Sequence, residues 1–596
     1  MTTALQEIQE AENPTAIPAR HRRRLLAVLA LLGITAIAFF FGLGRLSLIG
    51  PDEPRFAEAA REMFATGDYI TPRVAGEAAF DKPALLYWAI AGAFRLFGVN
   101  EFAARLPSAL AALVCVLFLY HALARTLSER LAWIAAMALA TSFFFIGLAR
   151  AVIMDMTFTA ALTIALLCIY LCSTTTGRTR LLYWTTAAVA TGMSVLAKGL
   201  IGIFLIAGIS ILAYALTRQP RGLRWRGWII GMGIGIVIFL AIVALWYVPV
   251  TLVNGHAFFD EFIIKHHFRR FLTNRYQHPQ PFWFFPAITL AGLLPWTFFL
   301  LPASARLRRI KPRSGEPKDT LLTLAWLWLM VPLIFFSISQ SKLPSYILPA
   351  FPALAIIVGF EIDRFWRGNR DRLLVASAWL TVLSVTICAA ALPIYLYPAA
   401  LFGRRLDAVL SLIPVCIGIL TATAMAMSRR RAMIIGVAAT VLSLVIGATI
   451  VVLPHLDDEI GLKRLSLTVA SELRPGEKMT FYQNKNYAPV FYAAGRAVTS
   501  PERGEGLNSF ELREVIAALE SEASLIIITT ASNQSLFTDN PLFEAEMIAQ
   551  QGNHRALRVR LVRRQKESGS TKSTARHWDR RLATEPQSHR EKTTKC

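Results

Sequence analysis

The chain has 596 residues, of which 55% are hydrophobic and 17% are charged, and its mean hydropathy is +0.47. Apolar runs recur from Leu25 almost to Leu453, which excludes a set of soluble domains with polar surfaces over that part of the chain. The formal net charge of +23 suggests nucleic-acid binding in a soluble protein, but here the basic residues form short clusters between apolar runs, which favours a membrane-topology signal.

The cysteine pattern supports neither a zinc site nor a disulfide framework. None of the six cysteines belongs to a CxxC pair, and five of them lie inside apolar runs, where we interpret them as core residues. The cysteines are Cys115, Cys168, Cys172, Cys388, Cys416 and Cys596.

Residues 1–24 form a polar segment that ends in the basic run RHRRR. The apolar run that follows is too long for a signal peptide and lacks a small-residue cleavage pattern, so we expect it to be retained as a first transmembrane helix. A transmembrane domain then extends over 25–455, because many of its apolar runs reach the roughly 20 residues that a membrane-spanning helix needs.

About thirteen spans meet this length criterion. Their predicted centres are near residues 37, 114, 140, 163, 189, 207, 240, 293, 329, 352, 383, 416 and 442. Every second connection, counted from the N-terminus, carries the basic excess, which predicts a cytoplasmic N-terminus by the positive-inside rule. The loops 44–103, 252–281 and 339–346 and the C-terminal part then face outward, into the periplasm of a Gram-negative host.

The first external loop, 44–103, concentrates charge beside a membrane-length apolar run. Its segment 54–65 is predicted to be an amphipathic interfacial helix, with Asp52 or Glu53 as its cap. Arg55 in the first turn opposes the helix dipole, so an anionic ligand explains it better than a structural role does. The alternative is that these charges pair and solvate the helix.

Two shorter elements carry further carboxylates. Asp81 and Lys82 in the run FDKP are expected at the membrane surface, although this is a common loop pattern. Asp155 lies at the edge of a span, where burial without a partner is costly. A helix-cap role for Asp155 remains an equal alternative.

Two later external loops contain cations that depart from the positive-inside pattern. The loop 252–281 carries several, Arg270 among them, which suggests phosphate binding; its His267 is most simply a solvated histidine. In the loop 339–346, Lys342 and Tyr346 contact a headgroup or serve as interfacial anchors, and the sequence does not separate these two interpretations.

From residue 456 the composition is that of a soluble domain. A small α/β domain is predicted over 456–563, with strands at EKMTFYQN, PVFYAA and SLIIITT and a helix over 509–522. The basic, Ser/Thr-rich segment 564–596 is expected to be disordered. The chain contains no Gly-rich phosphate loop.

Four segments carry a resemblance to a known family. They are DEPRFAEAAREM at 52–63, GDYITPRVAGEAAFDKPALLYW at 67–88, the pair Met154–Asp155, and SKLPSYILP at 341–349. With them the chain resembles the polytopic glycosyltransferases of the GT-C superfamily that use polyprenyl-phosphate sugars, and among these the aminoarabinose transferases of lipid A, relatives of the protein O-mannosyltransferases.

This resemblance implies roles for individual residues. Asp52 corresponds to the catalytic carboxylate and Asp155 to a second essential one, with Glu53 and Asp81 nearby; Asp81 stands where relatives often have Glu. The donor phosphate would be held by Arg55, Lys82, Arg270, Lys342 and Tyr346. The pattern does not settle whether a divalent metal is needed, for which Asp81 and His267 are the candidate ligands.

The resemblance implies an inverting transfer of 4-amino-4-deoxy-L-arabinose, or a related sugar, from undecaprenyl phosphate to lipid A or another cell-envelope acceptor. A transporter or flippase of a lipid-linked sugar is the alternative, and a membrane scaffold is a weaker one. A transporter needs ionisable groups near mid-membrane. Lys198 is the one apparent candidate, and we interpret it as part of an external turn between two spans.

Overall fold

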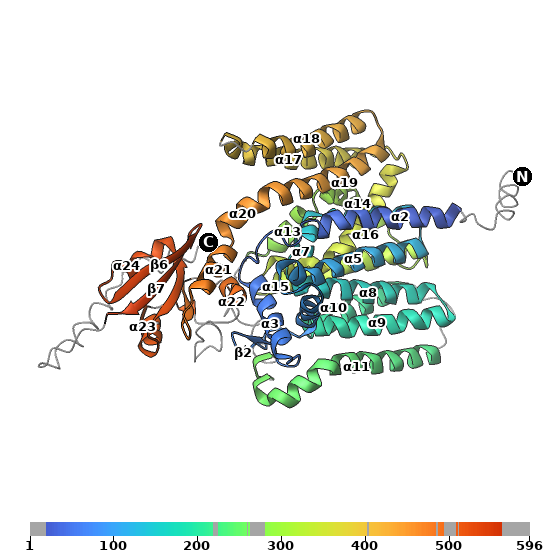
Figure 1. The fold of residues 1–596 in the computed structure, drawn as a ribbon. Helices are drawn as coiled ribbons and strands as arrows, with labels where there is room; N and C mark the ends of the chain where they lie inside the picture. Colours follow the sequence, from blue (N-terminus) through green and yellow to red (C-terminus); the bar gives the residue numbers. More distant parts are fainter. Residues whose placement is uncertain are drawn as a thin grey trace, which may run out of the picture.

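The computed structural model describes residues 19–217, 225–258, 260–262, 280–401, 405–483, 487–493, 508–509 and 512–562. The predictions for Arg270, His267 and the segment 564–596 lie outside these residues. A large helical bundle is followed by a smaller sheet region at one of its ends (Figure 1).

The first half of the bundle contains ten described helices. They are α2 (Ala19–Thr35), continued by the π-helical turn η1 (Ala36–Phe40), α3 (Asp52–Thr66), α4 (Leu85–Phe97), α5 (Glu101–Thr126), α6 (Glu129–Ala140), α7 (Phe143–Ala149), α8 (Met154–Thr174), α9 (Gly177–Lys198), α10 (Ile201–Leu216) and α11 (Trp225–Phe258). Between α3 and α4, the two short strands β1 (Arg73–Val74) and β2 (Glu77–Ala78) form an antiparallel pair.

The second half of the bundle is also helical, but short 3-10 and π-helical segments interrupt its helices more often. Its elements are α13 (Phe284–Gly292), η3 (Trp296–Phe299), α14 (Leu300–Ala305), η4 (Leu307–Arg309), α15 (Pro317–Ile338), η5 (Pro344–Ala350), α16 (Phe351–Trp366), α17 (Arg372–Leu401), α18 (Arg405–Ala426), α19 (Arg430–Gly447), η6 (Ala448–Val452) and α20 (Leu453–Ile460).

Seven of the described helices are long and apolar enough to cross a membrane, or nine if each bent helix pair is one span. The fold class is therefore confirmed as a multi-pass, helical membrane protein, but the count of thirteen spans is not. Hydropathy detects apolar runs but does not show whether each run forms one straight helix. The axes of α6 and α7 differ by 66°, and those of α13 and the η3–α14 segment differ by 108°. Four further apolar helical stretches measure 10–17 residues within the described part of the chain: Arg24–Phe40, Leu85–Phe97, Ile201–Leu216 and Ser411–Ala426.

The bundle core is built around α8 and the η5–α16 segment, whose apolar stretches are 78% and 83% buried, and small residues let helices in this core approach closely. A Cβ added at Gly359 of α16 would lie 2.8 Å from the Cβ of Ala135 on α6, so only glycine fits there. By contrast, the corresponding window of α11 is only 11% buried, and α11 lies at the edge of the bundle (Figure 1). Its apolar side chains therefore face the lipid.

Basic connections that are far apart in sequence meet at one end of the bundle. Arg24 Nε lies 2.8 Å from Glu129 Oε1, and Arg130 Nε lies 2.6 Å from Asp363 Oδ1. Arg430 donates to the carbonyl oxygen of Phe365 at 3.1 Å. Because these residues flank α2, α6, α16 and α19, their connections lie on one face, which we call the basic end.

The C-terminal region contains a mixed five-stranded sheet in the order β4-β3-β5-β7-β6. The strands are β3 (Lys478–Tyr482), β4 (Asn508–Ser509), β5 (Leu525–Thr530), β6 (Phe543–Gln551) and β7 (His554–Leu561), and the helices of this region are α21 (Lys463–Glu472), α22 (Ala488–Tyr492), α23 (Leu512–Ser521) and the single turn α24 (Ser535–Thr538), preceded by η7 (Ala531–Asn533). β3 pairs in parallel with β4 and β5, whereas β7 is antiparallel to β5 and β6. Alternating side chains of β5 enter two apolar clusters, one on each face of the sheet.

The predicted strands at EKMTFYQN and SLIIITT are confirmed as β3 and β5, and the predicted helix is α23. The predicted strand at PVFYAA is wrong, because these residues form the helical turn α22. Pro489 near its start pre-sets the helical backbone angle, and Phe491 packs into the cluster between α3 and α4. Strands β6 and β7 were not predicted.

Candidate active site

Helix α3 begins at Asp52 and ends where Gly67 adopts a φ of 74° and donates to the carbonyl of Met63. Its buried stripe includes Phe56, Ala60 and Met63, as the amphipathic pattern predicts. The N-cap position is Pro51, and no side chain caps the helix, so the predicted capping role of Asp52 or Glu53 is wrong. Glu53 instead turns toward the protein interior.

The Glu53 carboxylate is held by four hydrogen bonds and is buried. It accepts from the backbone nitrogens of Ile49 at 3.0 Å and Val152 at 2.8 Å. It also accepts from Arg105 of α5, through Nε at 3.1 Å and Nη2 at 2.8 Å. Glu53 thus joins the loop before α3, helix α5 and the turn before α8, and it positions its neighbours instead of facing a substrate.

Arg55, Asp81 and Lys82 form one charged group on the adjacent surface. Arg55 Nη1 lies 2.9 Å from Asp81 Oδ2, and Lys82 Nζ lies 3.5 Å from the same oxygen. The Arg55 guanidinium also lies 6.0 Å from the ring centroid of Tyr487 in the C-terminal region. Two cations thus lie beside one carboxylate, and Arg and Lys side chains placed in this way can bind an anionic ligand.

Asp155 pairs with Lys198, which is not among the site residues predicted from the sequence. Lys198, the last residue of α9, forms an ion pair with Asp155 in the first turn of α8. The N-cap of α8 is Ile153, with no side-chain cap, so the helix-cap alternative for Asp155 is not observed. The Lys198 ammonium also lies 4.4 Å from the ring centroid of Tyr346, which brings η5 to the same place.

The carboxyl of Asp52 interacts electrostatically with members of both groups. Burial raises the pKa of its carboxyl, while the cations of Lys82 and Arg55 lower it and the carboxylates of Asp81 and Asp155 raise it further. The side chain of Asp52 is nevertheless exposed to solvent. The surrounding protein therefore excludes part of the water near the carboxyl but does not cover the carboxyl itself. Within the described residues Asp52 accepts no hydrogen bond, which leaves this carboxylate available to a bound molecule.

Lys342 lies apart from this cluster in its contacts. It is buried, and its Nζ donates to the carbonyl oxygen of Gln280 at 2.9 Å. Arg270, the other cation predicted for this purpose, lies outside the described residues. Phosphate binding by Lys342 stays a prediction.

No three His, Cys, Asp or Glu side chains gather as metal ligands anywhere in the described ranges. His267 lies outside them, so the possible metal site formed with Asp81 is untested.

The C-terminal region contacts the bundle beside this cluster. Tyr492 of α22 accepts a hydrogen bond from Leu48 N at 3.0 Å and donates one to Glu101 Oε1 at 2.9 Å. Lys463 Nζ lies 2.7 Å from the same Glu101 oxygen, and Ser47 N donates to Asp457 Oδ1 at 2.8 Å. Figure 1 shows α21 and α22 next to α3. We call this face of the bundle the site end.

The site end and the basic end are opposite ends of the bundle. Helix α8 begins at the site end with Asp155, and α9 returns there with Lys198. Helix α16 starts directly after η5, which carries Tyr346, and finishes with Asp363 and its basic neighbours.

Comparisons with known proteins agree with this architecture. Residues 81–247 match the family described as dolichyl-phosphate-mannose-protein mannosyltransferase. The chain covers 97% of the structure of ArnT from Cupriavidus metallidurans bound to undecaprenyl phosphate, with a TM-score of 0.71 and 24% sequence identity over 89% of this chain. The archaeal oligosaccharyltransferase AglB from Archaeoglobus fulgidus aligns with a TM-score of 0.53 and 12% identity over 89% of this chain and 73% of that one.

The chain is therefore a multi-pass membrane protein with the fold of the glycosyltransferases that use polyprenyl-phosphate sugars, and the resemblance seen in its sequence is confirmed. In sequence it is similar to undecaprenyl phosphate-alpha-4-amino-4-deoxy-L-arabinose arabinosyl transferases. It is 32% identical to that of Aeromonas salmonicida over 60% of this chain, and 31% identical to that of Pectobacterium carotovorum over 61% of it. These matches span 63% of the length of each relative.

Proposed function

We propose that the protein is an inverting glycosyltransferase that moves 4-amino-4-deoxy-L-arabinose, or a related sugar, from undecaprenyl phosphate to lipid A or another envelope acceptor. One observation carries the proposal: the accessible carboxylate of Asp52 lies among the charges of Arg55, Lys82 and Asp155 at the site end. The names of the sequence relatives supply the sugar and the lipid carrier.

In this reaction the bond between the sugar C1 and the phosphate oxygen breaks, and a bond from C1 to an acceptor oxygen forms on the opposite face. Negative charge develops on the departing phosphate, and fixed cations stabilise it best. Arg55 and Lys82 are suited to this role because both cations lie beside Asp81 and near the carboxyl of Asp52, whose pKa they lower. Lys198 adds a third cation, which Asp155 and the Tyr346 ring hold in place.

Asp52 has two possible duties, and the acceptor decides between them. A hydroxyl acceptor would transfer its proton to the Asp52 carboxylate, whose raised pKa suits a general base. A phosphate acceptor is already a nucleophile, and Asp52 would then orient it or stabilise positive charge on the sugar ring. Both duties require the ionised form of Asp52.

We place the protein in the bacterial inner membrane, with a cytoplasmic N-terminus and a periplasmic site end. This orientation is supported by the basic end, since positive charge is retained in the cytoplasm. We also propose the division into a transmembrane domain, 25–455, a periplasmic α/β domain, 456–563, and a basic tail. Such an orientation gives the site access to lipid-linked donors instead of cytosolic nucleotide sugars.

A flippase is a weaker proposal than an enzyme. Lys198 is the one apparent candidate in the sequence for the ionisable group that a transporter needs near mid-membrane. That lysine is paired with Asp155 at a helix end, and the sequence relatives are named as transferases.

Lipid mass spectrometry of a deletion strain tests this function. Complementation with wild type should restore one sugar-sized mass on lipid A, and Asp52→Asn should not restore it. Glu77→Gln is the matched control, because Glu77 is an exposed carboxylate in the same loop and should behave as wild type. An unchanged glycolipid and glycan profile across all four strains would count against the enzyme.

A further inference from the structure

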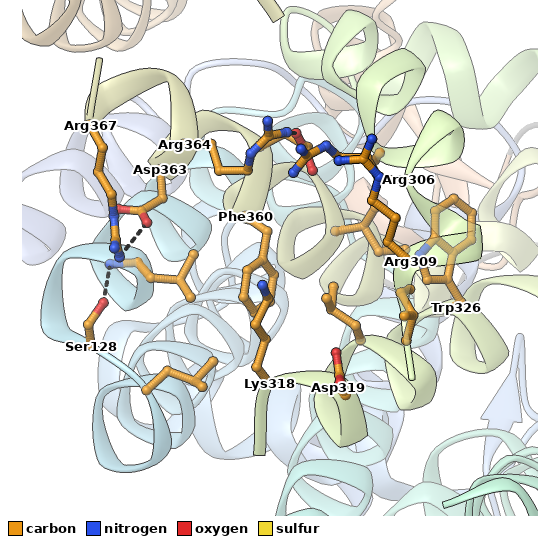
Figure 2. A pocket seen from close by; sticks show the side chains of 17 residues that line it. Ser128, Arg306, Arg309, Lys318, Asp319, Trp326, Phe360, Asp363, Arg364 and Arg367 are labelled. Atoms are coloured by element: carbon orange, nitrogen blue, oxygen red, sulfur yellow. Dashed lines mark hydrogen bonds and ion pairs between the residues drawn. The ribbon is translucent and has the colours of Figure 1, made fainter. Parts of the chain in front are cut away.

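A cavity of about 410 Å³ lies at the basic end (Figure 2). Its walls come from the α5–α6 connection, the end of α14 with η4, the start of α15 and the last turns of α16. Helix α15 has 22 residues and starts at this cavity, so its other end lies about 33 Å away, across the membrane. The cavity is therefore separate from the site around Asp52.

Cations outnumber carboxylates in its lining. The charged lining residues are Arg306, Arg309, Lys318, Arg364, Arg367, Asp319, Glu361 and Asp363. Asp363 already forms two ion pairs. Its Oδ1 lies 2.6 Å from Arg130 Nε, and its Oδ2 lies 2.8 Å from Arg367 Nη2. Glu361 is paired with Arg364.

The remaining cations lack such partners. In the part of the chain that the structure describes, Arg306, Arg309 and Lys318 form no ion pair with a carboxylate. Burial and the nearby charges of Arg364 and Arg309 lower the pKa of Arg306, although Glu361 and Asp371 act in the opposite direction. Figure 2 shows the Arg306 and Arg364 side chains along the same wall. Crowded guanidinium groups of this kind are stabilised by an anion.

One donor in this wall also lacks an acceptor. Arg364 Nη2 is buried and forms no hydrogen bond, although Asp371 Oδ2 lies 3.6 Å from it. A buried guanidinium nitrogen without an acceptor costs free energy, and a phosphate oxygen in the cavity would satisfy it. Arg364 thus adds an observation that is independent of the charge count.

The rest of the lining is apolar. Leu131, Trp326 and Phe360 contribute side chains beside the arginines, and Figure 2 shows the Phe360 ring in the middle of the cavity wall. Free phosphate needs no such surface, but the glycerol backbone and upper acyl chains of a lipid do. Basic pockets between helices on the cytoplasmic side are a recognised mode of binding anionic lipid headgroups.

We propose that this cavity binds a phosphate group, carried by an anionic membrane phospholipid, between Arg306, Arg309 and Arg364. The positive-inside rule alone explains basic residues in this connection but requires no cavity, and arginines that do not line one, such as Arg308, would satisfy it. The ligand would bridge α14, α15 and α16 at the end opposite to the transfer site.

The test uses the purified full-length protein in detergent, with native mass spectrometry to measure the lipid retained during titration. The three probes are phosphatidylglycerol, zwitterionic phosphatidylcholine and inorganic phosphate. The variants are the double variant Arg306→Gln/Arg309→Gln and the single variant Arg309→Gln. The control is Arg308→Gln, which removes the same single charge as Arg309→Gln but from a neighbour that does not line the cavity. A thermal midpoint in phosphatidylcholine shows whether each variant is folded.

We expect wild type and Arg308→Gln to bind phosphatidylglycerol in preference to phosphatidylcholine. The double variant should lose at least about tenfold in phosphatidylglycerol affinity, and Arg309→Gln should lose part of that. Equal losses in Arg308→Gln and the double variant would overturn the proposal, as would equal affinity for the two lipids. Displacement of phosphatidylglycerol by millimolar phosphate would assign the site to the soluble anion and overturn the lipid part.

Discussion

Lys198, the final residue of α9, pairs with Asp155 in the first turn of α8 and faces the ring of Tyr346, 4.4 Å from its centroid. These three residues come from separate elements, so the arrangement ties α8, α9 and η5 together at the site end. Gly199 follows Lys198 with a φ of 78°, which ends α9 there. The lysine is thereby directed to Asp155 and not to bulk solvent.

Replacement of Lys198 by Ala should reduce sugar transfer at least about 100-fold, because a cation next to the departing phosphate is lost. Transfer from a labelled polyprenyl-phosphate sugar by purified protein is the measurement. Arg95→Ala is the control, since Arg95 is an exposed cation on α4. Full activity of Lys198→Ala would remove Lys198 from the mechanism.

The pH profile of transfer should have an acid limb governed by Asp52. Burial raises the pKa of this carboxyl above 3.8, and the reaction requires the ionised form, so the rate should fall as pH decreases through the raised value. Lys82 is the largest influence lowering that pKa. Lys82→Gln should therefore move the limb to higher pH, whatever its effect on the maximal rate. An unmoved limb would show that another group controls it.

Glu53→Gln should destabilise the fold more than it alters the chemistry. Loss of the carboxylate leaves the buried guanidinium of Arg105 without its counter-charge, which costs about 3–5 kcal/mol. The thermal unfolding midpoint in detergent should drop accordingly. Glu129→Gln breaks the more exposed pair with Arg24 and should cost about 1 kcal/mol or less. Similar midpoints for the two variants would contradict this scaffolding role.

Tyr492→Phe should loosen the contact between the C-terminal region and the bundle. The change removes the hydrogen bonds to Leu48 and Glu101, at a cost of about 1–3 kcal/mol, while the ring can still face Lys463. Faster hydrogen exchange in α21 and α22 would report it. Tyr69→Phe, at an exposed tyrosine of the first loop, should leave exchange unchanged.

Glu58 should make stability fall as pH rises toward neutrality. Its carboxyl is fully buried, and burial raises its pKa to about 7 although Arg61 donates two hydrogen bonds of 2.7 Å to it. Between the ordinary value of 4.5 and about 7, the folded state binds more protons than the unfolded state. Stability from this group is therefore complete below pH 4.5 and is lost as pH rises through 7. Glu58→Gln should flatten the thermal midpoint across this range.

The sequence predicted the class of fold and the amphipathic helix α3, because membrane spans depend on local hydropathy and α3 on local periodicity. The site roles, which the resemblance implied, remain predictions. The directions of the side chains could not be predicted in this way. Asp52 and Glu53 are adjacent carboxylates with the same local pattern. Glu53 nevertheless points inward, because it accepts a hydrogen bond from Arg105, which lies 52 positions further along the chain. Only the packing of α5 against the first loop separates their roles.

Lys198 was excluded for a related reason. A cation before glycine at a helix end is typical of a turn, and the turn is present; its partner, Asp155, is 43 residues away. The strand prediction for PVFYAA is wrong for a different reason. A short aromatic and β-branched segment is typical of a strand, but Pro489 is also favoured in the first turn of a helix, and this segment is helical.

The four bonds to Glu53 also fix the rotation of α3 about its own axis. Successive residues of an α-helix are separated by about 100° of rotation, so a shift of one position would put Asp52 where Glu53 now lies and Glu53 where the buried Pro54 now lies. Insertion or deletion of a single residue between Ser47 and Pro51 would change this phase. Such a change would inactivate the protein although every residue of the cluster is still present. The side chain of Asp52, one methylene shorter than that of Glu53, would not reach the Arg105 guanidinium.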